Sequence, residues 1–281
     1  MSPEDLSAAL TEDPAEPGTV RLGGMALRNG LLVHGPDHWA VAVRSREGRI
    51  QVESGRKPRV RGAASQLPGL RGLARLGEAF ALLPVIKRKV PQVQLPFEDA
   101  KVIAAMAGSS MLSAAFRRVG RRSAGNELMV AVLGLAPAAL ALRDSQLAAY
   151  HGVEHKAIAA YEQGTDAADA AKEHDRCGSN LVAPMLISTM VGNVIVRSVL
   201  GARGPVAGVA VTLAGVAASV EMFAWSERNH ETSLAQAFRR PGYEMQRLFA
   251  TREPTAEQLE VGRAALAEIL RLEAPARPQD I

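Results

Sequence analysis

The chain of 281 residues has one cysteine, few aromatic residues and no basic segment at its N-terminus. A single cysteine excludes an intramolecular disulfide, so nothing in the sequence points to an oxidising compartment. Aromatic residues make up only 4% of the chain, whereas alanine, leucine, valine and glycine are abundant. This composition favours close packing of helices over an aromatic-rich β sandwich, and the length predicts one or two domains.

The first residues also lack the features of a signal peptide. Residues 1–20 contain five acidic residues and no lysine or arginine. A signal peptide instead begins with a basic region that is followed by an apolar core. We therefore expect no signal peptide, a disordered leader at 1–20 and a disordered tail at 271–281.

Basic residues only slightly outnumber acidic ones, so the net charge is only +4. The basic residues concentrate in the segment 44–61, RSREGRIQVESGRKPRVR. A modest basic surface is usually a solvated face, and the other interpretations are contact with anionic lipid or nucleic acid. The chain has no nucleic-acid-binding motif and no aromatic residues between these basic ones, so no nucleic-acid partner is expected.

The N-terminal part predicts a small β unit over 21–62. Within it, GMALRNGLLVHG, HWAVAVRS and RIQVES alternate partly between apolar and polar residues. A turn at Glu47-Gly48 separates the last two of these segments, which favours a hairpin or meander.

The sequence predicts a helix on each side of the apolar middle of the chain. In the region 63–100, which we expect to hold an amphipathic helix and a linker, the helix should end near Pro84. Leucine and phenylalanine fall at helical spacing in it, at Leu70, Leu73, Leu76 and Phe80. A polar helical region is expected over 225–270, with Thr255 as the N-cap of a helix that packs near the site.

Four uncharged runs in the middle of the chain are the strongest fold signal. A bilayer span needs about 20 largely apolar residues, and about 17 is near the lower limit. The last two runs just meet this length. The first two are shorter, so they either cross with flanking side chains that snorkel or do not fully cross the bilayer. The runs are 102–116, 128–142, 177–196 and 204–220.

These runs predict a helical membrane region over 101–224. Small residues recur every few positions in them, which suits tight helix contacts within lipid. The expected fold is therefore mainly α, a multi-pass helical protein of the bacterial inner membrane with a small N-terminal β unit. A large soluble helical core is the alternative, because the mean hydropathy of the chain is only +0.01.

The segment 150–177 holds the residues that predict chemistry. His151, Glu154 and His155 form H-x-x-E-H, and positions i and i+4 lie on one face of a helix. His174 and Cys177 follow closely in the sequence. Imidazole and thiolate suit a divalent metal, above all zinc, and four such donors complete a tetrahedral shell.

Several interpretations of these residues stay open. In the first interpretation, Glu154 activates metal-bound water, as the glutamate of H-x-x-E-H enzymes does. In the second, Glu154 is itself a metal ligand or orients His151. In another, Cys177 is a nucleophile that His174 or His155 activates. In the simplest, the histidines are hydrogen-bonded helix residues and the cysteine is a small buried hydrophobe.

Four blocks of sequence resemble the DUF1385 family of YqhQ-like bacterial membrane proteins, and together they extend over most of the chain. The resemblance implies a multi-pass inner-membrane protein and a metal-dependent enzyme, with no reaction that carries over. His151, Glu154, His155, Lys156, His174, Arg176 and Cys177 match its Y-H-G-x-E-H-K and H-x-R-C-G motifs. The blocks are 23–44, 150–162, 174–181 and 241–266.

Two positions depart from the family pattern. The family has an acidic residue where this chain has Asn29, and an arginine where it has His34. The segment after the cysteine-glycine pair also differs, with Ser179-Asn180-Leu181 in place of Thr-Ser-Phe. The missing carboxylate at Asn29 puts activity in question more than it does metal binding.

Three functions are compatible with this sequence. The first is a metal-dependent membrane hydrolase, with the metal on His151, His155, His174 and Cys177 and with Glu154 as general base. Its substrate would be lipid-linked or a membrane protein, and Lys156 and Arg176 would bind an anionic head group. The second is a non-catalytic membrane scaffold or assembly factor with a closed, structural metal site.

Transport ranks last. An ionisable cluster inside a membrane marks an ion path, but this cluster falls between the apolar runs. Glu221, which ends the last run, is expected at a membrane boundary. Membrane lipid is the expected partner in all three cases, and the sequence does not define an oligomeric state.

Overall fold

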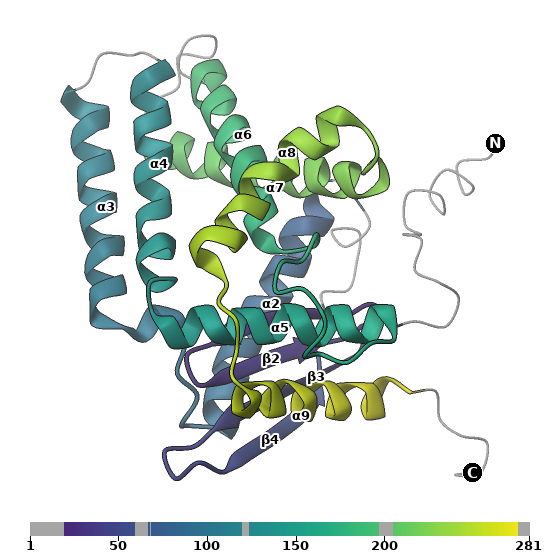
Figure 1. Cartoon of the computed structure of the whole chain (residues 1–281). Coiled ribbons are helices and arrows are strands. Elements are labelled where there is room, and N and C mark those ends of the chain that lie inside the picture. Colours follow the sequence, from purple (N-terminus) through teal and green to yellow (C-terminus); the bar gives the residue numbers. More distant parts are fainter. Residues whose placement is uncertain (1–19, 60–66, 68, 120–123, 197–204, 275–281) are drawn as a thin grey trace.

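Figure 1 shows the computed structural model of the chain, which describes residues 20–59, 67, 69–119, 124–196 and 205–274. Most of the predicted leader at 1–20 and of the predicted tail at 271–281 lies outside these residues. The chain is mainly helical, with a small antiparallel sheet near the N-terminus, as the sequence predicted.

The sheet is a four-stranded meander in which each strand pairs with the next. A tight turn joins its last two strands at the predicted position, where Gly48 has a φ of 83°. Glycine adopts this left-handed conformation without a steric penalty. The strands are β1 (Gly23–Leu27), β2 (Gly30–His34), β3 (His38–Arg44) and β4 (Ile50–Arg56).

Helices cover both faces of this sheet, which explains why β2 and β3 are buried on both sides. Helices α5 (Ser145–Gln163) and α9 (Ala256–Glu273) pack on one face, against a side-chain set that includes Leu31, Val33, Ala40 and Ala42. Helix α2 (Leu70–Lys89) packs on the other face, against Leu32, Trp39, Val41 and Val43. Each large apolar side chain buried in this way contributes ~1.5–3 kcal/mol.

Helix α2 does not end near Pro84, so that prediction is wrong. The helix continues to Lys89, with Pro84 inside it. Pro84 lies on the exposed side of the helix, whereas Leu82, Leu83 and Ile86 are buried on the sheet. Water can therefore satisfy the carbonyl that a proline leaves without its hydrogen bond, and the packed side of the helix continues.

The remaining helices form a second part of the molecule, where α3 and α4 stand side by side and α6 packs against α7 (Figure 1). Large apolar side chains are exposed along all four, including Met111, Met129, Val191 and Val209. Of the described helices, α7 alone is long and apolar enough to cross a membrane. The bounds are α3 (Ala100–Val119), α4 (Ala124–Ala141), α6 (Val182–Val194), α7 (Pro205–Arg228) and α8 (Ser233–Met245).

The run 177–196 changes helix type along its length. Its first residues form a 3₁₀ turn, η3 (Gly178–Leu181), α6 then has 13 residues, and a π turn follows at 195–196. The 13 α-helical residues alone extend about 20 Å, against about 30 Å for the apolar part of a bilayer, and residues 197–204 lie outside the described part of the chain. Helices α4 and α5 qualify as a span only when taken together, and they are bent by 91° where they meet.

Candidate metal centre

Helix α5 carries the H-x-x-E-H motif and is anchored at both ends. Its N-cap is Asp144, whose carboxylate accepts hydrogen bonds from the backbone N–H groups of Gln146 and Leu147 and pairs with Arg28. Gly164 ends the helix in the left-handed conformation. The helix lies across the sheet, so one side is packed and the side with the motif meets the segments 172–177 and 246–252.

Gly152 explains how the second of these segments approaches the helix. A Cβ atom at this position would lie 2.2 Å from the carbonyl oxygen of Arg252. The backbone N–H of Arg252 also donates to the carbonyl of Ala148, at 2.9 Å. The missing side chain thus allows the segment to lie against α5, which brings the carbonyl of Ala250 to His151.

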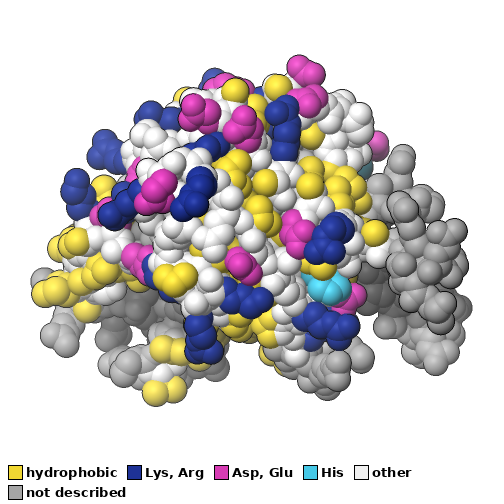
Figure 2. Space-filling view, turned by 90° about the horizontal axis from the view of Figure 1, so that it is seen from below, with side chains coloured by type: hydrophobic (Ala, Val, Ile, Leu, Met, Phe, Trp, Pro, Cys, Tyr) yellow, Lys and Arg dark blue, Asp and Glu magenta, His cyan; other side chains and the backbone are white. Residues whose placement is uncertain are grey.

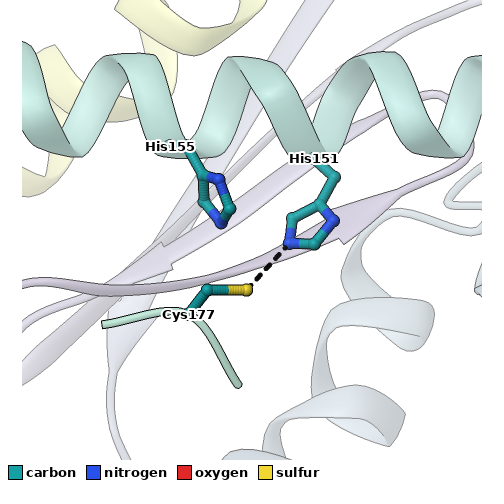
Figure 3. Close-up of side chains that lie close together, drawn as sticks. All are labelled: His151, His155 and Cys177. Atoms are coloured by element: carbon teal, nitrogen blue, oxygen red, sulfur yellow. Dashed lines mark hydrogen bonds between the residues drawn. The ribbon is translucent and has the colours of Figure 1, made fainter. Parts of the chain in front are cut away.

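His151, His155 and Cys177 lie close together, with one ligand atom from each within 4.8 Å of the others (Figure 3). Nδ1 of His151 lies 2.8 Å from the carbonyl oxygen of Ala250, so it carries the proton and donates. Nε2 of His151 then accepts from the Cys177 thiol, at 3.4 Å. The two histidine rings are in contact, with centroids 4.4 Å apart.

His155 is prepared in the same way. Its Nδ1 lies 2.6 Å from the carbonyl oxygen of Lys172, to which it donates. Nε2 is buried and has no hydrogen-bond partner among the described atoms. Burial and the nearby His151 lower the pKa of His155 to about 2, so the ring is neutral and its free nitrogen is a lone-pair donor.

Cys177 is held by the turn that it begins. It is the N-cap of η3, and its sulfur accepts a hydrogen bond from the backbone N–H of Ser179. Burial raises the pKa of the Cys177 thiol to about 11, so the cysteine is protonated without a cation beside it. To hold a metal ion, Cys177 would have to release this proton to solvent or to a nearby base, because thiolate is the ligand form.

Gln246, which the sequence did not single out, holds this loop in place. It is fully buried in a π-helical turn, η5 (Gln246–Ala250). Its side-chain oxygen accepts from the backbone N–H of His174, and its nitrogen donates to the His174 carbonyl and to the hydroxyl of Ser179. Only the unusual turn type marks it, since π-helical turns occur frequently at functional sites.

His174 is near the cluster, but its ring nitrogens form hydrogen bonds outside it. Its ring centroid is 5.7 Å from that of His155. Nε2 lies 3.3 Å from the carboxylate of Glu162, and Nδ1 accepts from the backbone N–H of Arg176. Both ring nitrogens are therefore in use, and the described structure brings together three of the four predicted ligands.

Glu154 lies between α5 and strand β1. A Cβ atom at Gly24 would lie 2.6 Å from Cγ of Glu154, so the glycine makes room for this side chain. Burial raises the pKa of Glu154, although His151, His174 and the backbone N–H of Ala26 act in the opposite direction. A carboxyl group with a raised pKa is suited to accept and return a proton near neutral pH.

The two predicted substrate-binding residues are engaged in other contacts. The ammonium of Lys156 is buried and donates to the carbonyls of Ala168 and Ala170, and it pairs with Glu253 at 2.7 Å. The guanidinium of Arg176 pairs with Glu162. Both side chains tie segments around the cluster together.

Asn29 and His34 lie outside the cluster. The amide of Asn29 bonds only backbone groups, at Arg44, Gln92 and Gln94, and so fixes the β1–β2 turn to the loop after α2. Nδ1 of His34 lies 3.4 Å from the ammonium of Lys57. Neither contact supplies an acid to the site.

The fold and this cluster define a mainly helical protein that holds two histidines and a cysteine between a helix and two loops. Residues 142–272 match the family described as "Protein of unknown function (DUF1385)", and this segment carries the whole cluster. The resemblance to this family that the motifs indicated is thereby confirmed over these residues.

A curated relative is similar to this protein over most of the chain. The "Uncharacterized protein YqhQ" of Bacillus subtilis (strain 168) is 23% identical over 297 residues, which cover 90% of this chain and 93% of the relative. No solved structure matches the chain.

Proposed function

We propose that this chain is a membrane-bound, metal-dependent enzyme, most simply a hydrolase, in which His151, His155 and Cys177 hold a divalent metal ion. The observation that carries the proposal is the hydrogen bonding of the two rings. Each ring donates Nδ1–H to a backbone carbonyl and turns Nε2 toward the thiol. Histidines that bind metals are oriented in this way, by a partner on the other nitrogen. The two nitrogens and one sulfur favour zinc over magnesium or calcium.

Catalysis requires a position on the metal that the protein does not fill. Three protein ligands leave such a position, whereas four close the shell. Glu154 is assigned as the general base, because its carboxyl group lies close enough to His151 and Cys177 to interact with them electrostatically and because burial raises its pKa. A metal ion held by these residues would supply Lewis-acid activation of water, and Glu154 would accept the proton that the water releases.

The membrane location is proposed from the second part of the molecule. Helix α7 contains an 18-residue window with a mean hydropathy of 1.8, and only 17% of that window is buried. The exposed apolar side chains of α3, α4 and α6 favour further insertion into lipid and thus a multi-pass arrangement. By contrast, the sheet end of the molecule shows basic and acidic side chains side by side (Figure 2). A substrate that is lipid-linked or a membrane protein follows from this location.

A structural metal site in a non-catalytic scaffold is the second candidate. The observation that favours it is the position of His174, whose ring is 5.7 Å from that of His155. Loss of its hydrogen bond to Glu162 would free Nε2 to become a fourth ligand. A closed site with a cysteine ligand is typical of structural zinc.

Both candidate functions require a bound metal ion, so the metal content of the protein tests them together. The detergent-purified protein, prepared without chelator, should contain about one zinc ion per chain by mass spectrometry. His155→Ala should lose it. His230→Ala is the matched control, because His230 is exposed and lies on the turn after α7. A metal-free wild type after addition of zinc, or equal zinc in His155→Ala, contradicts the proposal.

A further inference from the structure

The few aromatic residues of this chain are concentrated in one place. Five of the eleven lie between positions 223 and 249. They fall at the end of α7 and along α8 and η5, and they are Phe223, Trp225, Phe238, Tyr243 and Phe249. Tryptophan and tyrosine gather at both interfaces of a membrane, where the polar edge of the ring meets the head groups.

Helix α8 is attached to the end of the membrane-span candidate. The rings of Trp225 on α7 and Phe238 on α8 are in edge-to-face contact, with centroids 6.4 Å apart. Helix α8 also packs against α6 and η3. Figure 1 shows it beside α6 and α7. It therefore lies where the chain leaves the apolar helices.

The outer side of α8 and η5 combines apolar and basic side chains. Leu234, Ala237 and Pro241 are exposed at helical spacing, so they share one side of α8. Tyr243, Leu248 and Phe249 are exposed beyond them, at 42%, 66% and 39%. Arg240 and Arg247 are exposed among them, and Arg247 forms an exposed ion pair with Glu244. An amphipathic helix of this kind lies in the plane of a bilayer interface, and its basic residues are attracted to anionic lipid.

The same segment is joined to the metal cluster. The carbonyl of Ala250, the last residue of η5, accepts the hydrogen bond from His151. Gln246, its first residue, holds the backbone of His174 and thereby the loop of Cys177. One short turn thus presents Leu248 and Phe249 outward and two supports of the cluster inward.

We propose that residues 233–250, the interfacial belt, dock on the anionic lipid surface of the bilayer and hold the metal cluster against the head groups. Apolar side chains of the belt enter the outer acyl region, and Arg240 and Arg247 meet lipid phosphates. The belt deepens the proposed function, because it implies that the substrate reaches the cluster from the interface. It rests on the membrane location in that proposal.

Spin labels at matched positions test the belt. Ala237→Cys on α8 and Ala267→Cys on α9 place one label each on an exposed helical alanine. The full-length protein is placed in nanodiscs that contain anionic lipid. The label at 237 should be more accessible to oxygen, which enters lipid, than to a water-soluble nickel chelate, and the label at 267 should show the reverse. Wild-type protein treated with the same label shows how much the buried Cys177 reacts. A label at Leu248→Cys tests a second position in the belt.

The outcomes separate the belt from the metal. Equal, water-like accessibility at 237, 248 and 267 overturns the belt, whatever the zinc content. A lipid-like label at 237 with no zinc in the same sample supports the belt and contradicts the metal proposal. Arg240→Gln with Arg247→Gln should shift the 237 label toward water in anionic nanodiscs and leave it unchanged in zwitterionic ones. An identical effect in both lipids overturns the role of the head groups.

Discussion

His151 and His155 each use Nδ1 to donate to a backbone carbonyl, and this choice sets the face that each ring turns to Cys177. The carbonyls belong to Ala250, 99 residues from His151 in the sequence, and to Lys172, 17 residues from His155. Removal of such an outer partner typically lowers metal affinity 10–100-fold, even though every ligand is retained. The segments that supply the carbonyls are thus part of the site.

Gly152→Ala tests this dependence without a change to any ligand. The new Cβ would meet the carbonyl oxygen of Arg252 at 2.2 Å, so the segment 250–252 must move away from α5. We expect zinc affinity to fall about 10–100-fold, because His151 loses the carbonyl of Ala250. Competition with a chelating dye measures the affinity.

Gly134→Ala on α4 is the matched control for this substitution. A Cβ there meets nothing within 4 Å. It should leave zinc affinity unchanged and stabilise the helix by up to about 1 kcal/mol. Unchanged zinc affinity in Gly152→Ala would contradict the role assigned to the Ala250 carbonyl.

At this scale the sequence predicts the histidine pair but not its surroundings. The i, i+4 spacing places His151 and His155 together because any helix does so. The fate of His174 depends instead on Glu162 and on the backbone of Arg176, neither of which spacing reveals. Gln246 has no sequence signal, since its role arises from a π-helical turn 72 residues from His174.

Among the elements, the sheet carries a group whose protonation opposes folding. Burial, with Lys57 beside it, lowers the pKa of His34 from 6.5 to about 4. The unfolded chain therefore takes up this proton first as the pH falls. The stability that the neutral ring contributes is fully present above about pH 6.5 and is lost between there and about pH 4.

His34→Gln should remove this part of the pH dependence. Relative to neutral pH, the wild type should lose at most about 2 kcal/mol more than the variant by about pH 5, at 1.36 kcal/mol per pKa unit. Thermal unfolding of metal-free protein across this range gives the difference. Other groups such as His155 act alike in both proteins, so they cancel. Parallel curves for the two proteins would show that His34 does not titrate as described.

The elements themselves were largely predictable. Alternation and a glycine turn gave the strands, and the Thr255 cap begins α9 as expected. The prediction that α2 ends near Pro84 was wrong because a proline need not end a helix where water can satisfy the carbonyl that loses its hydrogen bond. The sequence does not show that Pro84 lies on the exposed side of the helix. The uncharged composition of the run 177–196 did not show that its first residues form a 3₁₀ turn, with Cys177 as its N-cap.

For the whole molecule, the central question is what covers the apolar helices. Leu213 is 51% exposed on α7 and Leu76 is 43% exposed on α2, which packs on the sheet. Leu213→Arg should sharply reduce the fraction that resists carbonate extraction from membranes, because arginine at a helix centre costs about 3 kcal/mol on insertion. Leu76→Arg should leave that fraction unchanged.

An exposed arginine in water is usually harmless. If α7 faces water, both variants therefore behave as the wild type does, and neither the wild type nor the variants resist extraction. That result would contradict the membrane location. Composition alone could not decide between a membrane span and a soluble core, because both bury apolar helices and differ only in what surrounds them.

X-ray absorption at the zinc edge of the purified protein reports directly which atoms hold the metal. We expect one sulfur at about 2.3 Å, two imidazole nitrogens at about 2.0 Å and one further light ligand that exchanges with solvent. Cys177→Ser should remove the sulfur contribution. A shell of one sulfur and three imidazoles would show that His174 closes the site and that the metal is structural. A shell without sulfur would contradict the site itself.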